Sequence, residues 1–271
     1  MKKLLLILSL LFCAPVLAWN QRAPLQLSQC QVHSPYGFPE SNVAVQSICR
    51  QAYLVGYDAI EKIPRYVTYN LTPQHALGCV VRTNAFAADQ SVSNGATPAD
   101  YTRSGYDKGH VAPNGDLSWD TQVEFESFLM TNMVPQTPYT NRSIVKSAET
   151  LVRTWTAQLN QPFVVYGGPI FNLQDKTIGN GVKVPHAFFK IAINATTGQT
   201  VAWIFPNVST GDGDITKLRA SVAQIEQLSG IKFALPTNAT ELPAGKEWPA
   251  DFGKLTQTKR STCGTKTPID Q

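Results

Sequence analysis

Apolar residues recur at helical spacing in two long segments of the chain. Residues 141–159 carry the stronger pattern, an apolar stripe formed by Ile144, Ala148, Leu151, Val152 and Trp155. Residues 215–228 repeat the spacing and are followed by Gly230, a residue type that commonly ends helices. A shorter helix is predicted over 119–130, and the later part of 40–62 is also helix-like. The pattern therefore predicts two main helices and two lesser ones.

Strand patterns lie between these helices. Apolar and polar residues alternate at 66–70 and at 78–83, and the apolar run 162–165 is typical of a buried strand. Two further runs, 187–193 and 200–205, flank a glycine-containing turn and predict an antiparallel hairpin. Because helices and strands are interspersed and no internal repeat is visible, the pattern predicts one mixed α/β domain.

The first eighteen residues have the features of a secretory signal peptide. Lys2 and Lys3 precede the apolar run 4–12, and Val16-Leu17-Ala18 provides suitable residues for cleavage. This order predicts export to the periplasm or the exterior, with a mature chain of residues 19–271. The apolar run is shorter than the ~20 residues that a transmembrane helix needs, and no later stretch is suitable. No association with a membrane is therefore predicted.

Composition narrows the class of protein. Of the 271 residues, 43% are apolar and 15% are charged, which excludes a disordered chain. The 18 glycines and 18 prolines follow no triplet period, which excludes a collagen-like chain. The formal charge of +4 becomes smaller when Lys2 and Lys3 leave with the signal peptide. A nucleic-acid partner would therefore require a local basic patch rather than the global charge.

Cysteine usage agrees with export. Removal of the signal peptide would also remove Cys13 and leave four of the five cysteines. An even number of cysteines in an exported protein predicts two disulfides. Three connectivities are possible and the sequence does not choose between them; we favour Cys30 with Cys49 and Cys79 with Cys263. None of the four lies at a zinc-ligand spacing.

The candidate chemistry is concentrated between residues 82 and 153. Asp107-Lys108-Gly109-His110 places a histidine beside an acidic and a basic side chain, with a glycine that allows close backbone approach. A histidine with an ordinary pKa near 6.5 is suited to act as a general base. Taken alone, however, such a histidine is more often a surface or structural residue.

A second cluster follows at 131–153. On a helix with 3.6 residues per turn, Asn141, Glu149 and Arg153 lie at about 0°, 80° and 120° around the axis. One helix face would therefore carry an amide, a carboxylate and a guanidinium group. The structural alternative is an asparagine N-cap followed by an exposed Glu–Arg pair, which contributes only a few tenths of a kcal/mol.

The order of these residues resembles that of the DNA/RNA non-specific endonuclease family, the His-Me finger or ββα-metal nucleases. The family signature D-R-G-H is matched at 107–110, with Lys108 in place of the usual arginine. The family then has an asparagine before a Pro-Gln pair, followed at fixed intervals by asparagine, glutamate and arginine. Those positions are occupied here by Asn132, Asn141, Glu149 and Arg153. The resemblance covers about residues 53–236.

This resemblance implies an α+β fold with a central antiparallel sheet and a ββα-metal motif at the active site. It makes His110 the general base that deprotonates the attacking water. It makes Asn141 the direct ligand of a Mg²⁺ ion, for which Mn²⁺ or another divalent cation can substitute, and Glu149 a ligand through water. Mg²⁺ suits such a site because it retains several of its waters.

The remaining matched residues are implied to bind the phosphate or to support the site. Arg82, Lys108 and Arg153 would offer positive charge to the phosphate. Asp107 would shape the loop that carries the histidine, and Asn132 would help to hold the site. A guanidinium binds two phosphate oxygens as a fork whereas an ammonium is a point charge, so lysine at position 108 affects rate and substrate preference rather than the type of reaction.

The implied activity is hydrolysis of phosphodiester bonds in DNA, and by the same resemblance in RNA, to oligonucleotides with 5′-phosphate ends. Because contacts to phosphate carry no base information, weak sequence specificity is expected. Two alternatives stay open: an exported phosphodiesterase for small substrates, and a non-catalytic nucleic-acid-binding protein. The other histidines, His33, His75 and His186, are interpreted as structural, with a supporting role left open for His186. The oligomeric state is not predicted.

Overall fold

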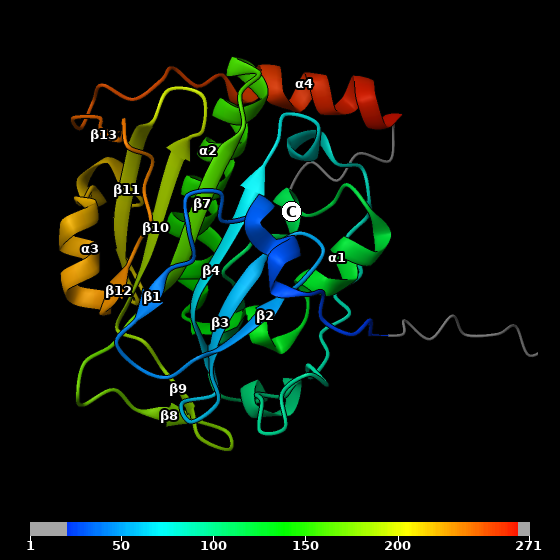
Figure 1. The fold of residues 1–271 in the computed structure, drawn as a ribbon, viewed down its shortest axis with the longest axis vertical. Coiled ribbons are helices and arrows are strands. Elements are labelled where there is room, and N and C mark those ends of the chain that lie inside the picture. Colours follow the sequence, from blue (N-terminus) through cyan, green and yellow to red (C-terminus); the bar gives the residue numbers. More distant parts are fainter. Residues whose placement is uncertain (1–20, 265–271) are drawn as a thin grey trace, which may run out of the picture.

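The computed structural model describes residues 21–264, so the predicted signal peptide, residues 1–18, lies outside the described part. The centre of the fold is a sheet of seven strands: β2 (Gln46–Cys49), β3 (Leu54–Asp58), β4 (Ile63–Leu71), β7 (Phe163–Ile170), β10 (Ala187–Asn194), β11 (Gln199–Pro206) and β13 (Thr240–Glu241). Their order across the sheet is β13-β11-β10-β7-β4-β3-β2 (Figure 1). Neighbouring strands are antiparallel except for the edge pair β11 and β13.

Within residues 21–264, three two-stranded pairs and four α-helices surround this sheet. The pairs join β1 (Glu40–Ser41) to β12 (Ile231–Lys232), β5 (Asp107–His110) to β6 (Met133–Gln136), and β8 (Thr177–Ile178) to β9 (Val182–Lys183). The α-helices are α1 (Thr121–Ser127), α2 (Lys146–Leu159), α3 (Val222–Ser229) and α4 (Phe252–Cys263). A π-helical segment, Thr140–Val145, leads directly into α2. No helix in this part of the chain has the length and apolar character needed to cross a bilayer.

Short 3₁₀ turns connect these elements. They lie at Leu27–Val32, His75–Leu77, Pro98–Tyr101, Asn114–Asp116, Met130–Asn132 and Ile215–Leu218.

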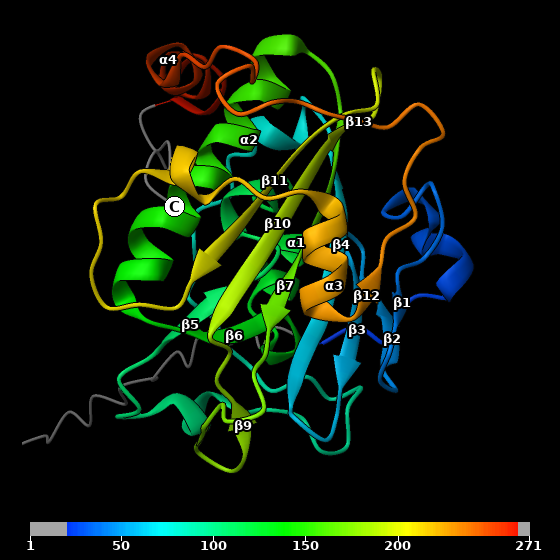
Figure 2. The ribbon, with the colours of Figure 1, turned by 90° about the vertical axis from the view of Figure 1, so that its left-hand side faces the viewer.

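The strands bury both faces of the sheet because successive side chains point to opposite sides. In β7, Phe163 and Val165 belong to the core that contains α2, whereas Val164 and Tyr166 belong to the core that contains α3. The sheet is thus the middle of three layers (Figure 2). Trp155 of α2 is buried against Phe163, with ring centroids 6.4 Å apart. This contact anchors α2 to the sheet.

Most of the predicted elements are confirmed. The helices expected over 119–130 and 141–159 correspond to α1 and to the π-helical segment with α2. The predicted strand at 66–70, the buried run and the hairpin correspond to β4, β7 and the pair β10–β11. The helical pattern at 215–228 divides into a 3₁₀ turn and α3, which Ser221 caps. The α+β fold with a largely antiparallel central sheet is therefore confirmed.

Two predicted elements are wrong. The helix-like segment 40–62 forms β1, β2 and β3 instead. Every residue of β3 is buried, so this strand lacks the alternation that would have distinguished it from a helix. The predicted strand at 78–83 is irregular, because its amides at Val80 and Thr83 donate to a carbonyl and a carboxylate in the segment 118–124.

Two disulfides fasten the ends of the described chain to the body. Cys30 and Cys49 join the 3₁₀ turn near the beginning of the described chain to β2, with Cα atoms 5.7 Å apart. Cys79 and Cys263 join the irregular segment 78–83 to the end of α4, with Cα atoms 5.3 Å apart. This is the pairing that we favoured from the sequence.

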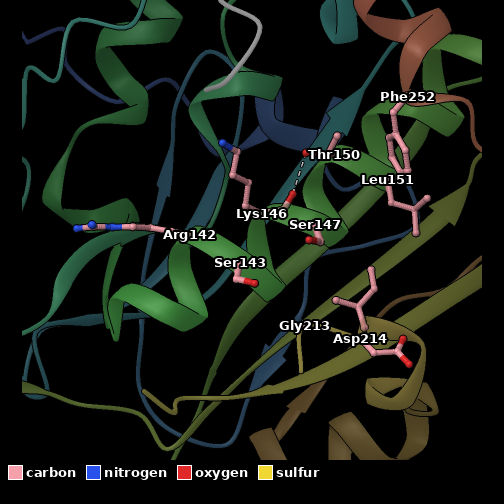
Figure 3. Close-up of a pocket in the computed structure, with 10 residues that line it drawn as sticks. Arg142, Ser143, Lys146, Ser147, Thr150, Leu151, Gly213, Asp214 and Phe252 are labelled. Atoms are coloured by element: carbon pink, nitrogen blue, oxygen red, sulfur yellow. Dashed lines mark hydrogen bonds between the residues drawn. The ribbon is translucent and has the colours of Figure 1, made fainter. Parts of the chain in front are cut away.

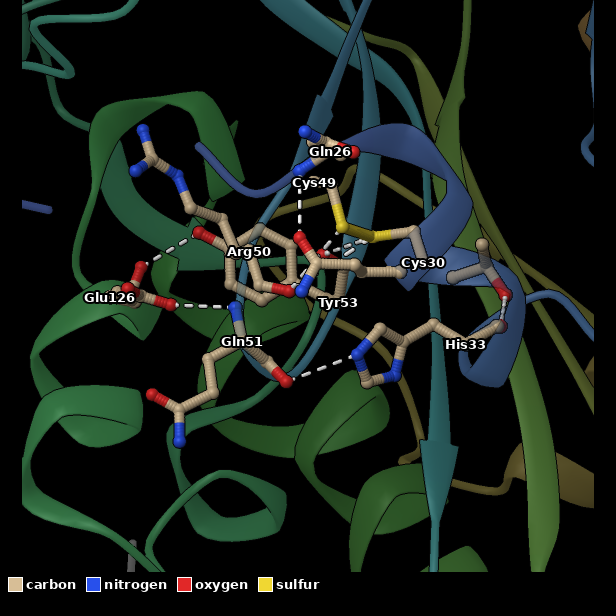
Figure 4. Close-up of a disulfide and its surroundings, with 10 residues drawn as sticks. Gln26, Cys30, His33, Cys49, Arg50, Gln51, Tyr53 and Glu126 are labelled. Atoms are coloured by element: carbon tan, nitrogen blue, oxygen red, sulfur yellow. Dashed lines mark hydrogen bonds between the residues drawn. A yellow bond between two sulfur atoms is a disulfide. The ribbon is translucent and has the colours of Figure 1, made fainter. Parts of the chain in front are cut away.

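The surroundings of the first disulfide connect the edge of the sheet to α1 (Figure 4). The Gln51 amide donates to Glu126 Oε2 at 3.0 Å, and the Tyr53 hydroxyl donates to the Glu126 carbonyl at 2.7 Å. His33 Nε2 lies 3.1 Å from the Gln51 carbonyl. Burial lowers the pKa of His33 to about 4, which makes this histidine a neutral, structural residue.

The two disulfides should contribute unequally to stability. In the chain-entropy model a disulfide stabilises more when it closes a longer loop, and the separations here are 19 and 184 residues. The model gives about 3 and about 5 kcal/mol for these loops. The free energy of unfolding, measured by urea titration, should therefore fall more for Cys79→Ala/Cys263→Ala than for Cys30→Ala/Cys49→Ala. Equal losses or the reverse order would contradict the entropic origin.

Candidate active site

The pair β5–β6 and helix α2 form a ββα unit beside the sheet. His110, the last residue of β5, pairs with Met133 of β6. A Cβ at Gly109 would lie 2.3 Å from the Gln136 amide group, so glycine at this position leaves room for the Gln136 side chain. From β6 the chain enters the π-helical segment and α2, which brings the candidate residues of the helix towards His110.

A cavity of about 280 Å³ opens beside this unit. Five of the residues predicted from the sequence line it: Arg82, Lys108, His110, Asn141 and Glu149. The other lining residues were not predicted: Pro113, Asn114, Gly115, Arg142 and Lys146. The remaining three predicted residues do not line the cavity: Asp107, Asn132 and Arg153.

His110 is 9% exposed and is enclosed by aromatic rings. Phe128 meets its ring edge-on with centroids 5.0 Å apart, and the centroid of Phe86 is 5.8 Å away. Burial and the nearby Arg82 guanidinium lower the pKa of His110 well below 6.5, so its imidazole is neutral at pH 7. Within residues 21–264 its buried Nε2 has no hydrogen-bond partner. Nδ1 is therefore the ring nitrogen that can serve the cavity.

The same two phenylalanines hold the basic side chains of the cavity. Lys108 Nζ lies 4.7 Å from the ring centroid of Phe86, and the Arg82 guanidinium carbon lies 4.9 Å from that of Phe128. Arg82 Nε also donates to Asn84 Oδ1 at 2.8 Å. A cation over an aromatic face is stabilised by about 0.5–2 kcal/mol. The rings therefore keep two positive charges close to the imidazole.

The amide of Asn141, in the π-helical segment, is oriented by Asp107. Asn141 Nδ2 donates to Asp107 Oδ2 at 2.9 Å. Because a carboxylate only accepts, this bond identifies the nitrogen end of the amide and leaves Oδ1 for the cavity. Arg142 donates to the same carboxylate through Nε at 2.8 Å and Nη2 at 2.7 Å. Burial acts to raise the pKa of Asp107, but the bonds from Arg142 and Asn141 outweigh it, so the pKa is lowered and the group stays charged.

Glu149 extends from α2 to the cavity with its side chain only 12% exposed. Lys190 Nζ lies 3.7 Å from Glu149 Oε1 and donates to the Val111 carbonyl at 3.3 Å. Burial raises the pKa of Glu149 to about 7; Lys190 opposes this shift, and Asp116 adds to it. Near neutral pH this carboxyl therefore lies between its protonated and charged forms, and a cation in the cavity would favour the charged one.

Arg153 is buried away from the cavity. Its Nε donates to Asp116 Oδ1 at 2.7 Å, and Asp116 Oδ2 accepts from the Tyr69 hydroxyl of β4 at 2.8 Å. The guanidinium lies against Gly115, where a Cβ would be 2.5 Å from Arg153 Nη2. The resemblance implied that this side chain offers charge to the phosphate. The structure places it instead in an ion pair that joins α2, the turn after β5 and β4.

Asn132 holds the turn that follows His110. Its Oδ1 accepts from the Ala112 amide at 2.9 Å. Its Nδ2 donates to the carbonyls of Ala112 at 2.9 Å and Ser127 at 2.8 Å. Asn132 is fully buried, and losing one of these bonds would leave a polar group unpaired, at a cost of about 1–3 kcal/mol. It thus fixes the backbone after His110 against the end of α1.

Three buried polar residues beside the cavity were missed from the sequence: Asn114, Asp116 and Glu124. Glu124 accepts from the Thr83 amide at 2.8 Å and from Asn114 Nδ2 at 3.3 Å, which positions the segment that carries Arg82. The Pro-Asn-Gly-Asp sequence at 113–116 is typical of a surface turn. Only its place just after the D-K-G-H tetrapeptide could have indicated a role.

The oxygen donors of the cavity suit one kind of cation. Among residues 21–264 no group of three His, Cys, Asp or Glu side chains could hold a metal ion. The cavity instead offers the amide oxygen of Asn141 and the carboxylate of Glu149. One neutral and one acidic oxygen fit a hard divalent cation that keeps several waters, whereas zinc prefers a closed set of nitrogen and sulfur ligands.

Comparison with known proteins agrees with this geometry. The family model for DNA/RNA non-specific endonuclease matches residues 32–240. A nuclease from Nostoc sp. is 30% identical over 68% of this chain and 71% of its own length. Human mitochondrial endonuclease G is 27% identical over 73% of this chain and 71% of its own length. The fold matches that of a crystal structure of an EndoG/EndoGI complex, with a TM-score of 0.72, 24% identity, and coverage of 84% of this chain and 99% of the other.

The chain thus combines a ββα unit with a largely antiparallel sheet, and its fold as a whole matches that of the EndoG/EndoGI structure. The chain belongs to the DNA/RNA non-specific endonuclease family, whose members depend on a divalent metal, and it is a nuclease. The resemblance inferred from the sequence is thereby confirmed.

The raised pKa of Glu149 should make stability depend on pH when no divalent cation is present. Below about pH 4.5 the carboxyl is protonated in both states; between 4.5 and about 7 the unfolded chain loses this proton while the native protein keeps it. Native stability should therefore fall as the pH rises through this window, by on the order of 3 kcal/mol from this group. Urea unfolding in chelator should show this fall for the wild type relative to Glu149→Gln. Parallel curves for the two proteins would contradict the raised pKa.

Proposed function

We propose that the protein is an exported, divalent-cation-dependent endonuclease that hydrolyses phosphodiester bonds of DNA and RNA without sequence specificity. The observation that carries this proposal is a neutral, nearly buried His110 at a cavity that also contains two basic side chains and the Asn141 amide. These are the parts that an in-line attack of water on a phosphodiester requires.

His110 would act as the general base at Nδ1. Because burial and Arg82 lower its pKa, the imidazole is unprotonated at neutral pH and can accept a proton from the attacking water. Phe86 and Phe128 restrict the ring through contacts on two sides. Asn132 fixes the backbone that follows it.

Arg82 and Lys108 would bind the phosphate. Both cations are held over aromatic rings and line the cavity, so they can contact the oxygens that become more negative during the reaction. These contacts do not distinguish bases or sugars. Cleavage of both DNA and RNA agrees with this mode of binding, and oligonucleotide products with 5′-phosphate ends are what the family resemblance implies.

Asn141 Oδ1 would hold the cation directly and Glu149 would hold it through water, with Mg²⁺ as the natural ion and Mn²⁺ or another divalent cation as substitutes. Such a cation supplies positive charge that stabilises the transition state of phosphoryl transfer. Asp107 presents the Asn141 oxygen by binding its amide nitrogen. Arg153 holds α2 in place through its ion pair with Asp116, on the side away from the cavity.

Export is supported by the signal-like sequence of residues 1–18 and by the disulfides in the described chain, since disulfides persist in oxidising compartments. The mature protein would then comprise residues 19–271 and act in the periplasm or outside the cell.

Replacing the base should abolish most cleavage without unfolding the protein. General bases contribute about 10²–10⁴-fold, so His110→Ala should lose that factor in plasmid nicking at saturating Mg²⁺ while still binding DNA. His186→Ala serves as the matched control, because His186 lies outside the cavity lining and should cut at the wild-type rate. Near wild-type nicking by His110→Ala would refute the assignment.

The cation should be needed for cleavage but not for folding. An amide oxygen is a neutral ligand, so the free enzyme should bind Mg²⁺ weakly, and excess chelator should stop cleavage while circular dichroism stays unchanged. Asn141→Ala should remove activity, Asn141→Asp should keep part of it, and Glu149→Gln should lose less than Asn141→Ala. Cleavage that persists in chelator, or a wild-type rate for Asn141→Ala in millimolar Mg²⁺, would overturn the cation assignment.

A further inference from the structure

A second, larger cavity lies along the outward side of α2. Its volume is about 690 Å³. Its walls come from the π-helical segment and α2, from the loop at 213–215, and from the start of α4 (Figure 3). We refer to this cavity as the α2 groove, lined by Arg142, Ser143, Lys146, Ser147, Thr150, Leu151, Gly213, Asp214, Ile215 and Phe252.

The α2 groove adjoins the catalytic cavity. Arg142 and Lys146 line both. Both are basic, and the Arg142 side chain is 69% exposed even though it is paired with Asp107. A polynucleotide strand that leaves the catalytic cavity on this side therefore enters the groove past two positive charges, which favour its next phosphate.

The far end of the α2 groove is apolar and carries an acidic group. Phe252 is 49% exposed, and Figure 3 shows its ring directed towards Leu151. Ile215 completes this apolar part, and Asp214 lies beside it. The Asp214 carboxylate caps the following turn by accepting from the Thr216 amide at 3.0 Å. Lys217 Nζ lies 3.6 Å from Asp214 Oδ2 and offsets part of its charge. The apolar side chains at this end suit a base, so the phosphate belongs at the basic end and the base at the apolar end.

We propose that the α2 groove binds the nucleotide next to the scissile phosphate, with its phosphate at Arg142 and Lys146 and its base stacked on Phe252. This inference rests on the proposed nuclease function and adds a subsite to it. From Lys146 to Leu151 helix α2 rises roughly 7.5 Å, which accommodates one phosphate and the adjoining base. An aromatic platform accepts every base, because each has a π-face.

The helix that carries Phe252 lies beyond the matched family region, which ends at residue 240. Three contacts fix α4 and the segment before it. The Trp155 indole donates to the Trp248 carbonyl at 2.7 Å, the Asp251 amide donates to Gln158 Oε1 at 3.1 Å, and the disulfide at Cys263 holds the other end. The platform is therefore rigidly placed by this chain's own C-terminal segment.

The test compares steady-state cleavage of a single-stranded oligonucleotide by wild type, Phe252→Ala and Phe252→Trp. Loss of the ring should raise KM about 5- to 20-fold. This is the lower part of the range for removing a stacked base, because Phe252 is only half exposed and offers less ring surface. The kcat should change by less than twofold, and Phe252→Trp should restore the wild-type KM. Leu173→Ala, at a fully exposed apolar position outside the groove, is the matched control.

Two further readouts separate stacking from other effects. Lys146→Gln should reduce the slope of log KM against log salt by about 0.7, the value for one phosphate contact of a single strand, whereas Phe252→Ala should leave the slope unchanged. On methyl p-nitrophenyl phosphate, which carries no base, Phe252→Ala should match the wild type. An unchanged KM for the oligonucleotide, or an equal loss on both substrates, overturns the subsite. Failure of the nuclease function itself would appear instead as retained cleavage by His110→Ala.

Discussion

The buried ion pair between Arg153 and Asp116 is the constraint on which the arrangement of the site depends. Asp116 follows β5 by a short turn, Arg153 belongs to α2, and Tyr69 of the central sheet binds the same carboxylate. Three elements that are distant in the sequence are thereby held at one point. Removing one partner of a buried pair leaves an uncompensated charge and typically costs about 3–5 kcal/mol. A change at either residue would therefore act first on the structure, by displacing α2 from β5, the strand that carries His110.

The same pair sets the electrostatics of the cavity. Asp116 is a fixed negative charge that raises the pKa of Glu149, while Arg153 and Lys190 oppose it. Burial is the largest of these effects, so the pKa of Glu149 rises to about 7 although Lys190, Arg153 and Arg82 lower it. A carboxyl with this pKa changes its charge easily when a cation arrives. The position of α2 and the affinity of the cavity for a cation therefore depend on the same buried charges, those of Asp116 and Arg153.

The sequence was most informative where one residue type at a fixed spacing is chemically required. The grouping of His110, Asn141 and Glu149 around one cavity could be predicted only through the family resemblance that these motifs carry. The orientation of Asn141 could not, because the π-helical segment changes the 3.6-residue repeat on which a helical wheel depends. The burial of Arg153 was not predictable either, since its partner lies in a turn that is polar enough for the surface.

Two parts of the fold were missed for related reasons. The strand β3 is buried on both faces, so apolar and polar residues do not alternate along it, and its pattern also fits a helix. Helix α4 is polar, with only Leu255 and Lys259 buried, so it has no apolar stripe to reveal it. Its position comes from a disulfide and from contacts of its flanking segment with α2, which are tertiary interactions that a local pattern does not contain.

The two cations beside His110 are not equivalent, and this bears on the lysine that replaces the family's arginine. Burial and the Arg82 guanidinium lower the pKa of His110, so Arg82 helps to keep the imidazole unprotonated, and in the proposed mechanism it also binds phosphate. Lys108 lies over Phe86 and near the ring of Tyr101, and an aromatic face attracts an ammonium group as it does a guanidinium. In the proposed mechanism the lysine therefore gives up bidentate contact with the phosphate, while the aromatic contacts of His110 do not depend on it.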